Sequence, residues 1–266
     1  MINRLSTNIR SGAGAVSRLG DGSLISSGGT LSPVGVSHWW DFSDITTLFQ
    51  DVEGMTPITT ANQPIMRVTD KQGAQHLSQS DSGKSPLYKT GEQNGKSIGY
   101  FDGSNDWLYS TGVSSLATPY TLHIVYKSRV ISNNAGVNDI IAGTDRTIIG
   151  VHSPTVLAAN KTPQTIIYAG LNLIYSGNVA NQMYGVITCV FNGSSSELFE
   201  NGVSKVLGDA GSSFGGLNTY FILGSISGGS RNHPIDVGEI LFCSGAQTSG
   251  DIAANVAYLN QQWNVF

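Results

Sequence analysis

Charged residues are scarce in this chain. Asp, Glu, Lys and Arg together make up 12% of its 266 residues, about half the share found in an average soluble domain. Long amphipathic helices usually carry Glu and Lys on their solvent side, so this composition argues against a helical fold. Serine, threonine, asparagine and glycine are abundant instead, which suits sheets with polar faces and many turns.

Long apolar runs and clustered basic residues are missing as well. No run of about 18 apolar residues occurs, so we expect no membrane insertion. The formal net charge of −4 offers no basic face for nucleic acid. The opening stretch MINRLSTNIRSGAGAVSRL lacks the apolar segment of a signal peptide. We therefore expect synthesis in a cytoplasm, without export by that route.

Cysteine is also rare. Cys189 and Cys243 both lie inside apolar runs, VITCVF and ILFCSG. Because cysteine is among the most buried residue types, two buried free thiols are expected. A disulfide between two strands is the alternative, and it depends on a Cα separation that the sequence does not contain.

Residues 1–35 differ in composition from the rest of the chain. They are rich in glycine and serine and have no sustained hydrophobic period. Such a segment buries too little apolar surface to order itself. We predict an irregular arm that docks on a partner protein, with docking on the chain's own domain as the alternative. The candidate docking residues are Ile2, Arg4, Leu5, Arg10 and Arg18.

Residues 36–266 show the pattern of a single all-β domain. Short segments rich in Ile, Val, Tyr, Phe and Thr alternate with Gly, Asn, Asp and Ser. The clearest hairpin is SELFENGVSKV, in which Asn201 and Gly202 suit the positive φ angles of a type I′ turn. Many strands without alternating helices favour a sandwich. The predicted strands are 97–101, 107–110, 120–127, 138–142, 147–152, 164–169, 171–175, 184–191, 197–200, 203–206, 220–224 and 237–243.

One helix is predicted, at the C-terminus. Thr248 or Ser249 can cap it, and Asp251 lies in its first turn near the positive end of the helix dipole. Four apolar residues then recur at helical spacing, which predicts a closing helix packed on the sandwich; a partner-binding helix is the alternative. These residues are Ile252, Val256, Leu259 and Trp263.

Four stretches, in order, resemble the concanavalin A-like (LamG-type jelly-roll) domains of phage structural and bacterial surface proteins. They are HWWDFSDITTLFQD, KSPLYKTGEQNGKSIGYFDGSNDWL, ELFENGVSKV and VGEILFCSGAQTSGDIAANVAYLNQQWNV. The resemblance covers residues 36–266. It implies a concanavalin A-like β-sandwich, or jelly roll, with a C-terminal closing helix. It also implies a tendency to bind glycans or virion partners, without specifying one activity.

Several polar residues of these stretches suit turns. Asp102, Asn105 and Asp106 fit a tight turn that their side chains stabilise, and a Ca²⁺ site is the alternative. Their spacing lacks the regular alternation of a loop that wraps the ion, and the histidines are scattered. We therefore expect no metal and no cofactor.

Asp41 and Asp44 are predicted in a turn or cap. Trp39 and Trp40 alternate across a strand, so only one can face the core.

The carboxylates argue against hydrolysis. Hydrolytic relatives in the resembled group carry two carboxylates on one face of one strand, and the reaction needs a flanking pair. Glu197 and Glu200 are three residues apart, as are Asp236 and Glu239, so each pair is expected on opposite strand faces. We therefore expect that the chain is not an enzyme. A pair assembled from distant loops is the alternative. Residues 211–215 match the nucleophile motif G-x-S-x-G by letter. That motif works only at a strand-to-helix elbow of an α/β sheet. Here it lies in a loop between predicted strands, so we treat the match as chance.

Exposed aromatic rings could bind a glycan, with Asn, Asp and Gln nearby to hydrogen-bond its hydroxyls. The candidates are Tyr168, Tyr175, Tyr184 and Tyr220, which lie in or beside predicted strands near polar loops. The alternative for each is packing in the core or against a neighbouring subunit.

The resemblance and the arm together predict a bacteriophage virion protein: a capsid decoration, fibre or tail-associated adhesin. Its arm would dock on other virion proteins, and its sandwich would display a surface for a host glycan. We also expect the protein to form a homo-oligomer. A glycan-active enzyme or free lectin of the same fold is the alternative, and a purely architectural role is a third.

Overall fold

The computed structural model describes residues 16–18, 24–26, 30–73, 75–111, 118–129, 136–142, 147–153, 164–177, 180, 182–212, 221–225 and 231–266. The chain divides into two units, Met1–Ser32 and Pro33–Phe266. In the first, strands β1 (Val16–Arg18) and β2 (Leu24–Ser26) pair antiparallel. This pair lies in the segment predicted to be irregular, because three-residue strands are too short to show a period in the sequence.

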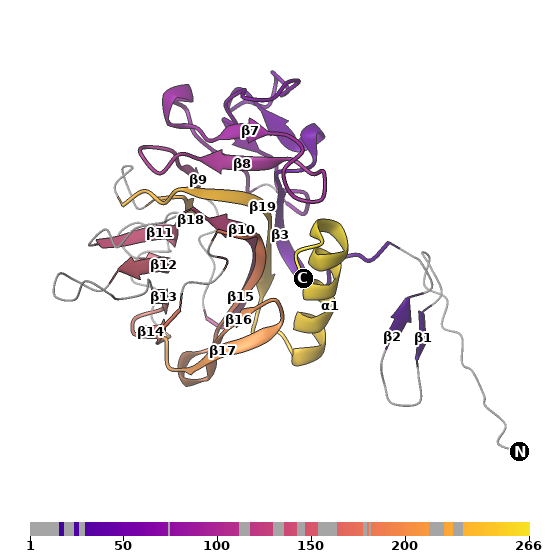
Figure 1. The fold of residues 1–266 in the computed structure, drawn as a ribbon, viewed down its shortest axis with the longest axis vertical. Helices are drawn as coiled ribbons and strands as arrows, with labels where there is room; N and C mark the ends of the chain where they lie inside the picture. Colours follow the sequence, from indigo (N-terminus) through magenta and orange to yellow (C-terminus); the bar gives the residue numbers. More distant parts are fainter. Residues whose placement is uncertain are drawn as a thin grey trace, which may run out of the picture. The chain divides into compact units, whose positions relative to one another are not determined.

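The second unit is a β-sandwich, as predicted (Figure 1). The first sheet has the order β17-β16-β15-β10-β19-β8-β7, with β3 also paired to β19. Its strands are β3 (Val36–Asp41), β7 (Leu87–Lys89), β8 (Ile98–Phe101), β10 (Tyr120–Ser128), β15 (Gly185–Phe191), β16 (Ser196–Glu200), β17 (Val203–Gly208) and β19 (Ile235–Ser244).

The second sheet has the order β14-β13-β12-β11-β18-β9-β6-β5-β4. Its strands are β4 (Leu48–Phe49), β5 (Arg67–Val68), β6 (Leu77–Ser78), β9 (Leu108–Ser110), β11 (Gly136–Ala142), β12 (Thr147–Ser153), β13 (Gln164–Tyr168), β14 (Asn172–Tyr175) and β18 (Phe221–Leu223). Short 3₁₀ helices lie at η1 (Ile45–Thr47), η2 (Ser82–Lys84) and η3 (Gly193–Ser195). All twelve predicted strands are present. Strand β3 lies where Trp39 and Trp40 were predicted to alternate across a strand. Strands β4 to β7 were missed, and each is only two or three residues long.

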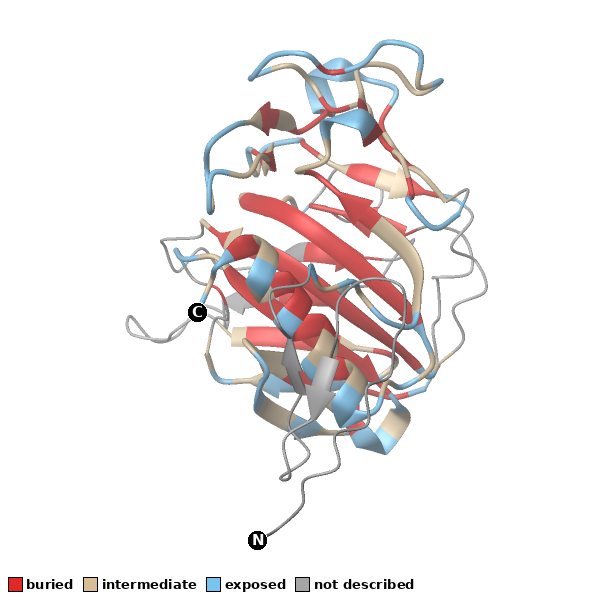
Figure 2. Ribbon diagram, turned by 90° about the vertical axis from the view of Figure 1, so that its right-hand side faces the viewer, coloured by how far each residue is buried: buried red, intermediate tan, exposed pale blue. Residues whose placement is uncertain are grey.

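The core lies between the two sheets. Inward residues of β10 and β19 pack there, and aromatic stacking joins Tyr120 to Phe191 and Phe242, at centroid distances of 4.6 and 5.0 Å. Both central strands are buried along almost their whole length (Figure 2). Burial of this apolar surface is the main favourable term in folding.

Strand β19 changes partners in its middle. Along one edge it pairs with β10 throughout; along the other, β8 pairs with its start and β3 with its end. A β-bulge at the changeover makes Gly238 an extra residue opposite β10. Val237 and Ile240 therefore both face the core. The bulge thus places Asp236 and Glu239 on the same outer face, which corrects the prediction that they point to opposite faces.

The two cysteines are free and buried, as expected. Cys189 in β15 packs in the core, whereas Cys243 in β19 is on the outer face of the same sheet and accepts a hydrogen bond from Asn255 at 3.9 Å. Their opposite directions exclude a disulfide in this fold.

The predicted C-terminal helix is α1 (Ser249–Trp263), and it covers the outer face of the first sheet (Figure 1). Thr248 caps it and forms a reciprocal capping box with Asp251. The predicted apolar stripe is buried, and Asn255 and Tyr258 are buried beside it. Within the part of the chain that the structure describes, no helix combines the length and apolar character needed to cross a bilayer.

Gly238 lets α1 approach the sheet. A Cβ atom built on it would lie 2.6 Å from the Trp263 ring, closer than such atoms pack. We predict that Gly238→Ala lowers the free energy of unfolding by about 1–3 kcal/mol, as overpacking does, in urea denaturation.

Gly250→Ala is the matched control, because its Cβ would meet only the Thr248 hydroxyl at 3.7 Å. It should be neutral or slightly stabilising, since alanine favours helix. Equal losses in both variants would contradict a specific contact between Gly238 and Trp263.

Candidate functional site

Two carboxylates meet on the outer face of the first sheet, beneath α1. Asp41 of β3 and Glu239 of β19 are direct partners across the strand pair, a relation that places Cβ atoms about 5 Å apart. The sequence prediction compared carboxylates along single strands and missed this pair. No sequence signal could have found it, because it depends on the pairing of strands from opposite ends of the chain.

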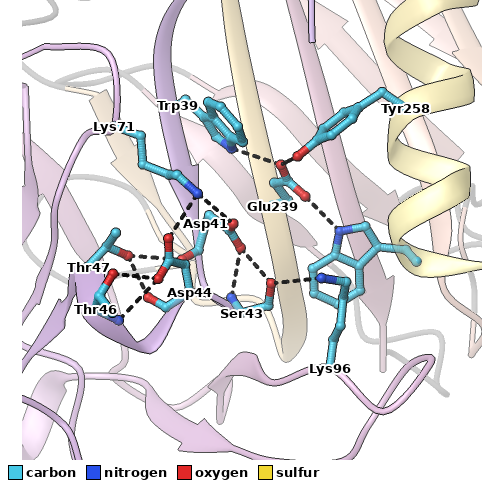
Figure 3. Close-up of polar contacts among 11 residues, drawn as sticks. Trp39, Asp41, Ser43, Asp44, Thr46, Thr47, Lys71, Lys96, Glu239 and Tyr258 are labelled. Atoms are coloured by element: carbon cyan, nitrogen blue, oxygen red, sulfur yellow. Dashed lines mark hydrogen bonds and ion pairs between the residues drawn. The ribbon is translucent and has the colours of Figure 1, made fainter. Parts of the chain in front are cut away.

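Glu239 is enclosed by aromatic side chains that donate hydrogen bonds to it (Figure 3). Its Oε1 accepts from the Trp39 indole at 2.8 Å and from the Tyr258 hydroxyl at 2.7 Å, and its Oε2 accepts from the Trp263 indole at 2.8 Å. Burial and the neighbouring Asp41 carboxylate raise the pKa of Glu239, although the three donors oppose this shift. Trp40, in contrast, is in the core, so the two tryptophans alternate as predicted.

Lys71 forms ion pairs with the carboxylates at the edge of this network. Its Nζ lies 3.2 Å from Asp41 Oδ2, 2.9 Å from Asp44 Oδ2 and 4.3 Å from the centre of the Trp39 ring (Figure 3). Burial opposes its charge, but attraction to Asp41 and Asp44 raises the pKa of Lys71 overall. Asp44 also caps η1, and Asp41 accepts from the Ser43 amide. The predicted turn and cap roles are confirmed.

This network attaches α1 to β3 and β19. A carboxyl group of raised pKa beside a second carboxylate is also an arrangement used in general acid–base catalysis. Here Glu239 is only 1% exposed, and both of its oxygens accept hydrogen bonds from the protein. In this structure Glu239 holds the helix, and Asp41 pairs with Lys71.

A second polar cluster is buried under α1. His123 of β10 has Nδ1 2.8 Å from the Thr188 hydroxyl and Nε2 2.7 Å from Gln247 Oε1. Asn255 of α1 donates to Gln247 Oε1 at 3.1 Å and to the Val34 carbonyl at 3.0 Å. Burial lowers the pKa of His123 to about 4, so the imidazole is neutral near pH 7 and donates through Nε2 to Gln247.

The three predicted glycan-binding tyrosines that the structure describes do not form one cluster. Tyr168 is half-buried at the end of β13, and Tyr175 packs against the core. Tyr184 lies on the outer face of the other sheet, and Tyr220 is outside the described residues. The packing of Tyr175 is the kind that the core alternative describes, and glycan binding by these tyrosines stays a prediction.

Tyr184 belongs to an internal ion network. Its hydroxyl donates to Asp236 Oδ2 at 3.2 Å, and Lys127 Nζ lies 4.6 Å from its ring centre. The Asp236 carboxylate also pairs with Lys127 at 2.6 Å and Arg129 at 3.0 Å. Burial, and then the Asp236 carboxylate, raise the pKa of Tyr184. These groups are occupied by one another, so the cluster stabilises the sheet.

Most of the predicted docking residues lie outside the part of the chain that the structure describes. Ile2, Arg4, Leu5 and Arg10 lie outside the described residues, and Arg18 is described only as the backbone end of β1. Their role in docking stays a prediction.

Asp102 and Asp106 stabilise the turn between β8 and β9. Asp102 Oδ1 accepts from the amides of Ser104 and Asn105 at 2.7 and 3.3 Å, and Asp106 Oδ2 accepts from the Asp102 amide at 2.8 Å. Burial raises the pKa of Asp106 to about 6. These hydrogen bonds are the turn chemistry that the sequence predicted.

A hollow of about 530 Å³ lies between the β16–β17 hairpin and α1. We call it the α1 groove. The hairpin turn is the predicted one, with φ of 51° at Asn201 and 76° at Gly202. Buried Ile252 and Val256 and two exposed alanines form the helix side. The remaining lining residues are Phe199, Asn201, Gly202, Ser249, Asn260, Gln261 and Phe266.

The last residues of the chain fold back onto the end of α1. Asn264 adopts a left-handed conformation with φ of 48°. The Asn260 side chain then accepts from the amides of Val265 and Phe266 at 2.9 and 3.1 Å and donates to the Phe266 carbonyl at 3.0 Å. This clamp holds Phe266 at the groove, with 57% of the residue exposed. The prediction from sequence did not include the α1 groove, because its lining comes from the hairpin and the helix together.

No family model and no curated protein matches the chain. Solved structures do. A sialidase from Trypanosoma rangeli in complex with 2,3-difluorosialic acid is 8% identical, with a TM-score of 0.57, over 97% of this chain and 36% of the sialidase. This chain thus spans about a third of the sialidase's length. Domain 4 of AbnA, an extracellular arabinanase from Geobacillus stearothermophilus, in complex with arabinotriose, is 12% identical, with a TM-score of 0.52, over 85% of this chain and 100% of that domain.

At these identities the likeness shows the fold alone, a β-sandwich consistent with the concanavalin A-like prediction. The prediction that the chain is not an enzyme is corrected, because the first structures it matches are sialidases. Its structural basis also fails, since two carboxylates do meet across β3 and β19. The fold likeness does not itself assign an activity to this chain.

Glu239 should be sensitive even to an isosteric change. We predict that Glu239→Gln lowers the free energy of unfolding by about 1–3 kcal/mol, because either orientation of the amide points its NH₂ at an indole N–H. Urea denaturation of this variant, Trp263→Phe and the double variant measures the coupling. The same loss from Glu239→Gln in both backgrounds would show that the Trp263 hydrogen bond is unimportant.

His123 should make stability depend on pH. Its folded pKa of about 4 lies below the ordinary value of 6.5, so the unfolded chain takes up the proton first. Its contribution is fully present above pH 6.5 and declines as the pH falls toward 4. Relative to His123→Gln, the wild-type protein should lose about 1.4 kcal/mol per pH unit in this window, measured by urea denaturation at several pH values.

Asp106→Asn provides a control of opposite sign. The folded pKa of Asp106, about 6, lies above its ordinary 3.8. The wild-type protein should therefore lose stability relative to this variant as the pH rises from 3.8 to 6. Slopes of the same sign in the two comparisons would contradict the assigned environments.

Proposed function

We propose that this chain binds carbohydrate and that the α1 groove is its binding site. The observation that carries the proposal is the groove's composition: two phenylalanine rings, Phe199 and Phe266, accompanied by the neutral polar side chains of Asn201, Ser249, Asn260 and Gln261. Sugars combine apolar ring faces with hydroxyl groups. Small-ligand sites pair mainly apolar and aromatic walls with a few polar groups that orient the ligand.

The size of the α1 groove suits an oligosaccharide. Its volume of about 530 Å³ falls within the range of small-ligand sites, roughly 300–1,000 Å³. The helix side extends from Ser249 to Gln261, which corresponds to about 18 Å at the rise of an α-helix. A short linear glycan can therefore lie along α1 instead of entering end-on.

The similar folds support this proposal. The arabinanase domain matches this chain along its whole length and was solved with arabinotriose, and the sialidase was solved with a sialic acid derivative. Carbohydrate is thus the ligand class that the two similar structures share. Neither structure is a virion protein, so the virion location, docking by residues 1–35 and homo-oligomer remain predictions from the sequence.

Phe266→Ala should weaken oligosaccharide binding by about tenfold or more, which is about 1.4 kcal/mol or more, because it removes an aromatic face from the groove. Its exposure means that the fold should be retained. Binding is measured by isothermal titration with a panel of oligosaccharides that includes arabinotriose.

Leu207→Ala is the matched control. Leu207 is 64% exposed on the neighbouring strand β17 and does not line the groove, so its removal should leave the affinity unchanged. Failure of the whole panel to bind would reject the proposed function. Binding that survives both Phe266→Ala and Phe199→Ala would place the sugar elsewhere.

A further inference from the structure

Among the residues that the structure describes, none that lines the α1 groove has a charged side chain. Its nearest charged neighbours in the sequence are Glu200, beside Asn201, and Asp251, in the first turn of α1. Lys205, across the hairpin, pairs with Glu200 at 3.1 Å. An anionic ligand in the groove would give up water without gaining a cation, and uncompensated burial of charge is costly.

Three cations elsewhere on the outer face of this sheet are already paired with carboxylates. Lys127 and Arg129 both contact Asp236, and Lys71 contacts Asp41 and Asp44. None of them lines the groove. Recruiting one to an anionic sugar would leave a buried carboxylate without its partner, which is strongly unfavourable.

The polar side chains that line the groove are neutral, and some of them present a hydrogen-bonding group to a ligand. Asn201 Oδ1 accepts from the Val186 amide at 2.9 Å, so its NH₂ group is the part that can donate to a ligand. Ser249, exposed at the start of α1, offers a hydroxyl that both donates and accepts. Groups of this kind match sugar hydroxyls.

Asn260 acts through Phe266. Its Oδ1 accepts two backbone amides and its Nδ2 donates to the Phe266 carbonyl. This clamp fixes the backbone that carries the exposed ring. A ring held in advance loses less conformational freedom when a ligand stacks on it, which favours binding.

Resting on the carbohydrate-binding function proposed above, we infer that the α1 groove selects neutral oligosaccharides over anionic ones, with Asn260 as the positioning residue for the Phe266 ring. A neutral sugar can place a ring face on Phe266 and its hydroxyls near Asn201 and Ser249. A sugar carboxylate would meet no cation in the groove.

Titration of the full chain with arabinotriose, sialyllactose and trigalacturonic acid tests the selectivity. We expect the neutral trisaccharide to bind at least about tenfold more tightly than either acidic sugar, and Phe266→Ala to remove that difference. Equal or tighter binding of an acidic sugar, lost on Phe266→Ala, would overturn the selectivity while leaving carbohydrate binding intact. Binding of none of the three or of the wider panel would instead reject the proposed function.

A charge placed in the groove should change its preference. Gln261→Lys puts a cation among the lining residues and should strengthen binding of trigalacturonic acid by at least about threefold in low salt. Gln262→Lys is the matched control, since it makes the same change one residue later, outside the lining. Equal gains in both variants would reduce the effect to net charge and overturn the assignment of selectivity to the groove.

The role of Asn260 is tested by a double-mutant cycle with arabinotriose. Asn260→Ala should weaken binding in the wild-type background and add little in the Phe266→Ala background. Independent, additive losses would overturn the positioning role. If Phe266→Ala changed the oligomeric state in gel filtration and not the sugar affinity, the groove would be an interface between copies, and the inference would fail.

Discussion

The attachment of α1 to the outer face of the first sheet depends on one buried carboxylate. Glu239 accepts hydrogen bonds from the indoles of Trp39 and Trp263 and from the Tyr258 hydroxyl, so a single side chain joins β3, β19 and α1. Removing a buried acceptor leaves its donors unsatisfied, and that penalty exceeds the worth of one hydrogen bond. Gly238 completes the attachment, because the Trp263 ring occupies the space that a side chain there would need.

This attachment also creates the candidate binding site. The α1 groove exists only while the helix lies beside the β16–β17 hairpin, since each supplies one wall. Gly202 at the hairpin tip is close enough that an added Cβ would lie 3.4 Å from Val256. The buried cluster of His123, Gln247 and Asn255 supports the same helix from below. Changes to this polar support should therefore alter the α1 groove indirectly, through the position of α1.

The distribution of charge separates two tasks on this face. Carboxylates and cations are gathered into internal pairs, around Lys71 on one side and Asp236 on the other. The groove between hairpin and helix is left neutral. Buried ion pairs are costly to break, so the paired charges serve the fold, while the neutral surface is available for a ligand that offers hydroxyls and apolar faces.

The amino-acid sequence by itself determined the local structure. Strand propensity, the Asn201–Gly202 turn, the helix cap at Thr248 and the apolar stripe to Trp263 act over a few residues, and each could be predicted from its own segment. What only the tertiary structure decided depends on pairing between distant segments. The meeting of Asp41 with Glu239, the bulge that turns Asp236 and Glu239 to one face, and the clamp of Phe266 by Asn260 at the groove follow from register and helix docking. Register is set by the packing of the whole sheet, so no local pattern contains it.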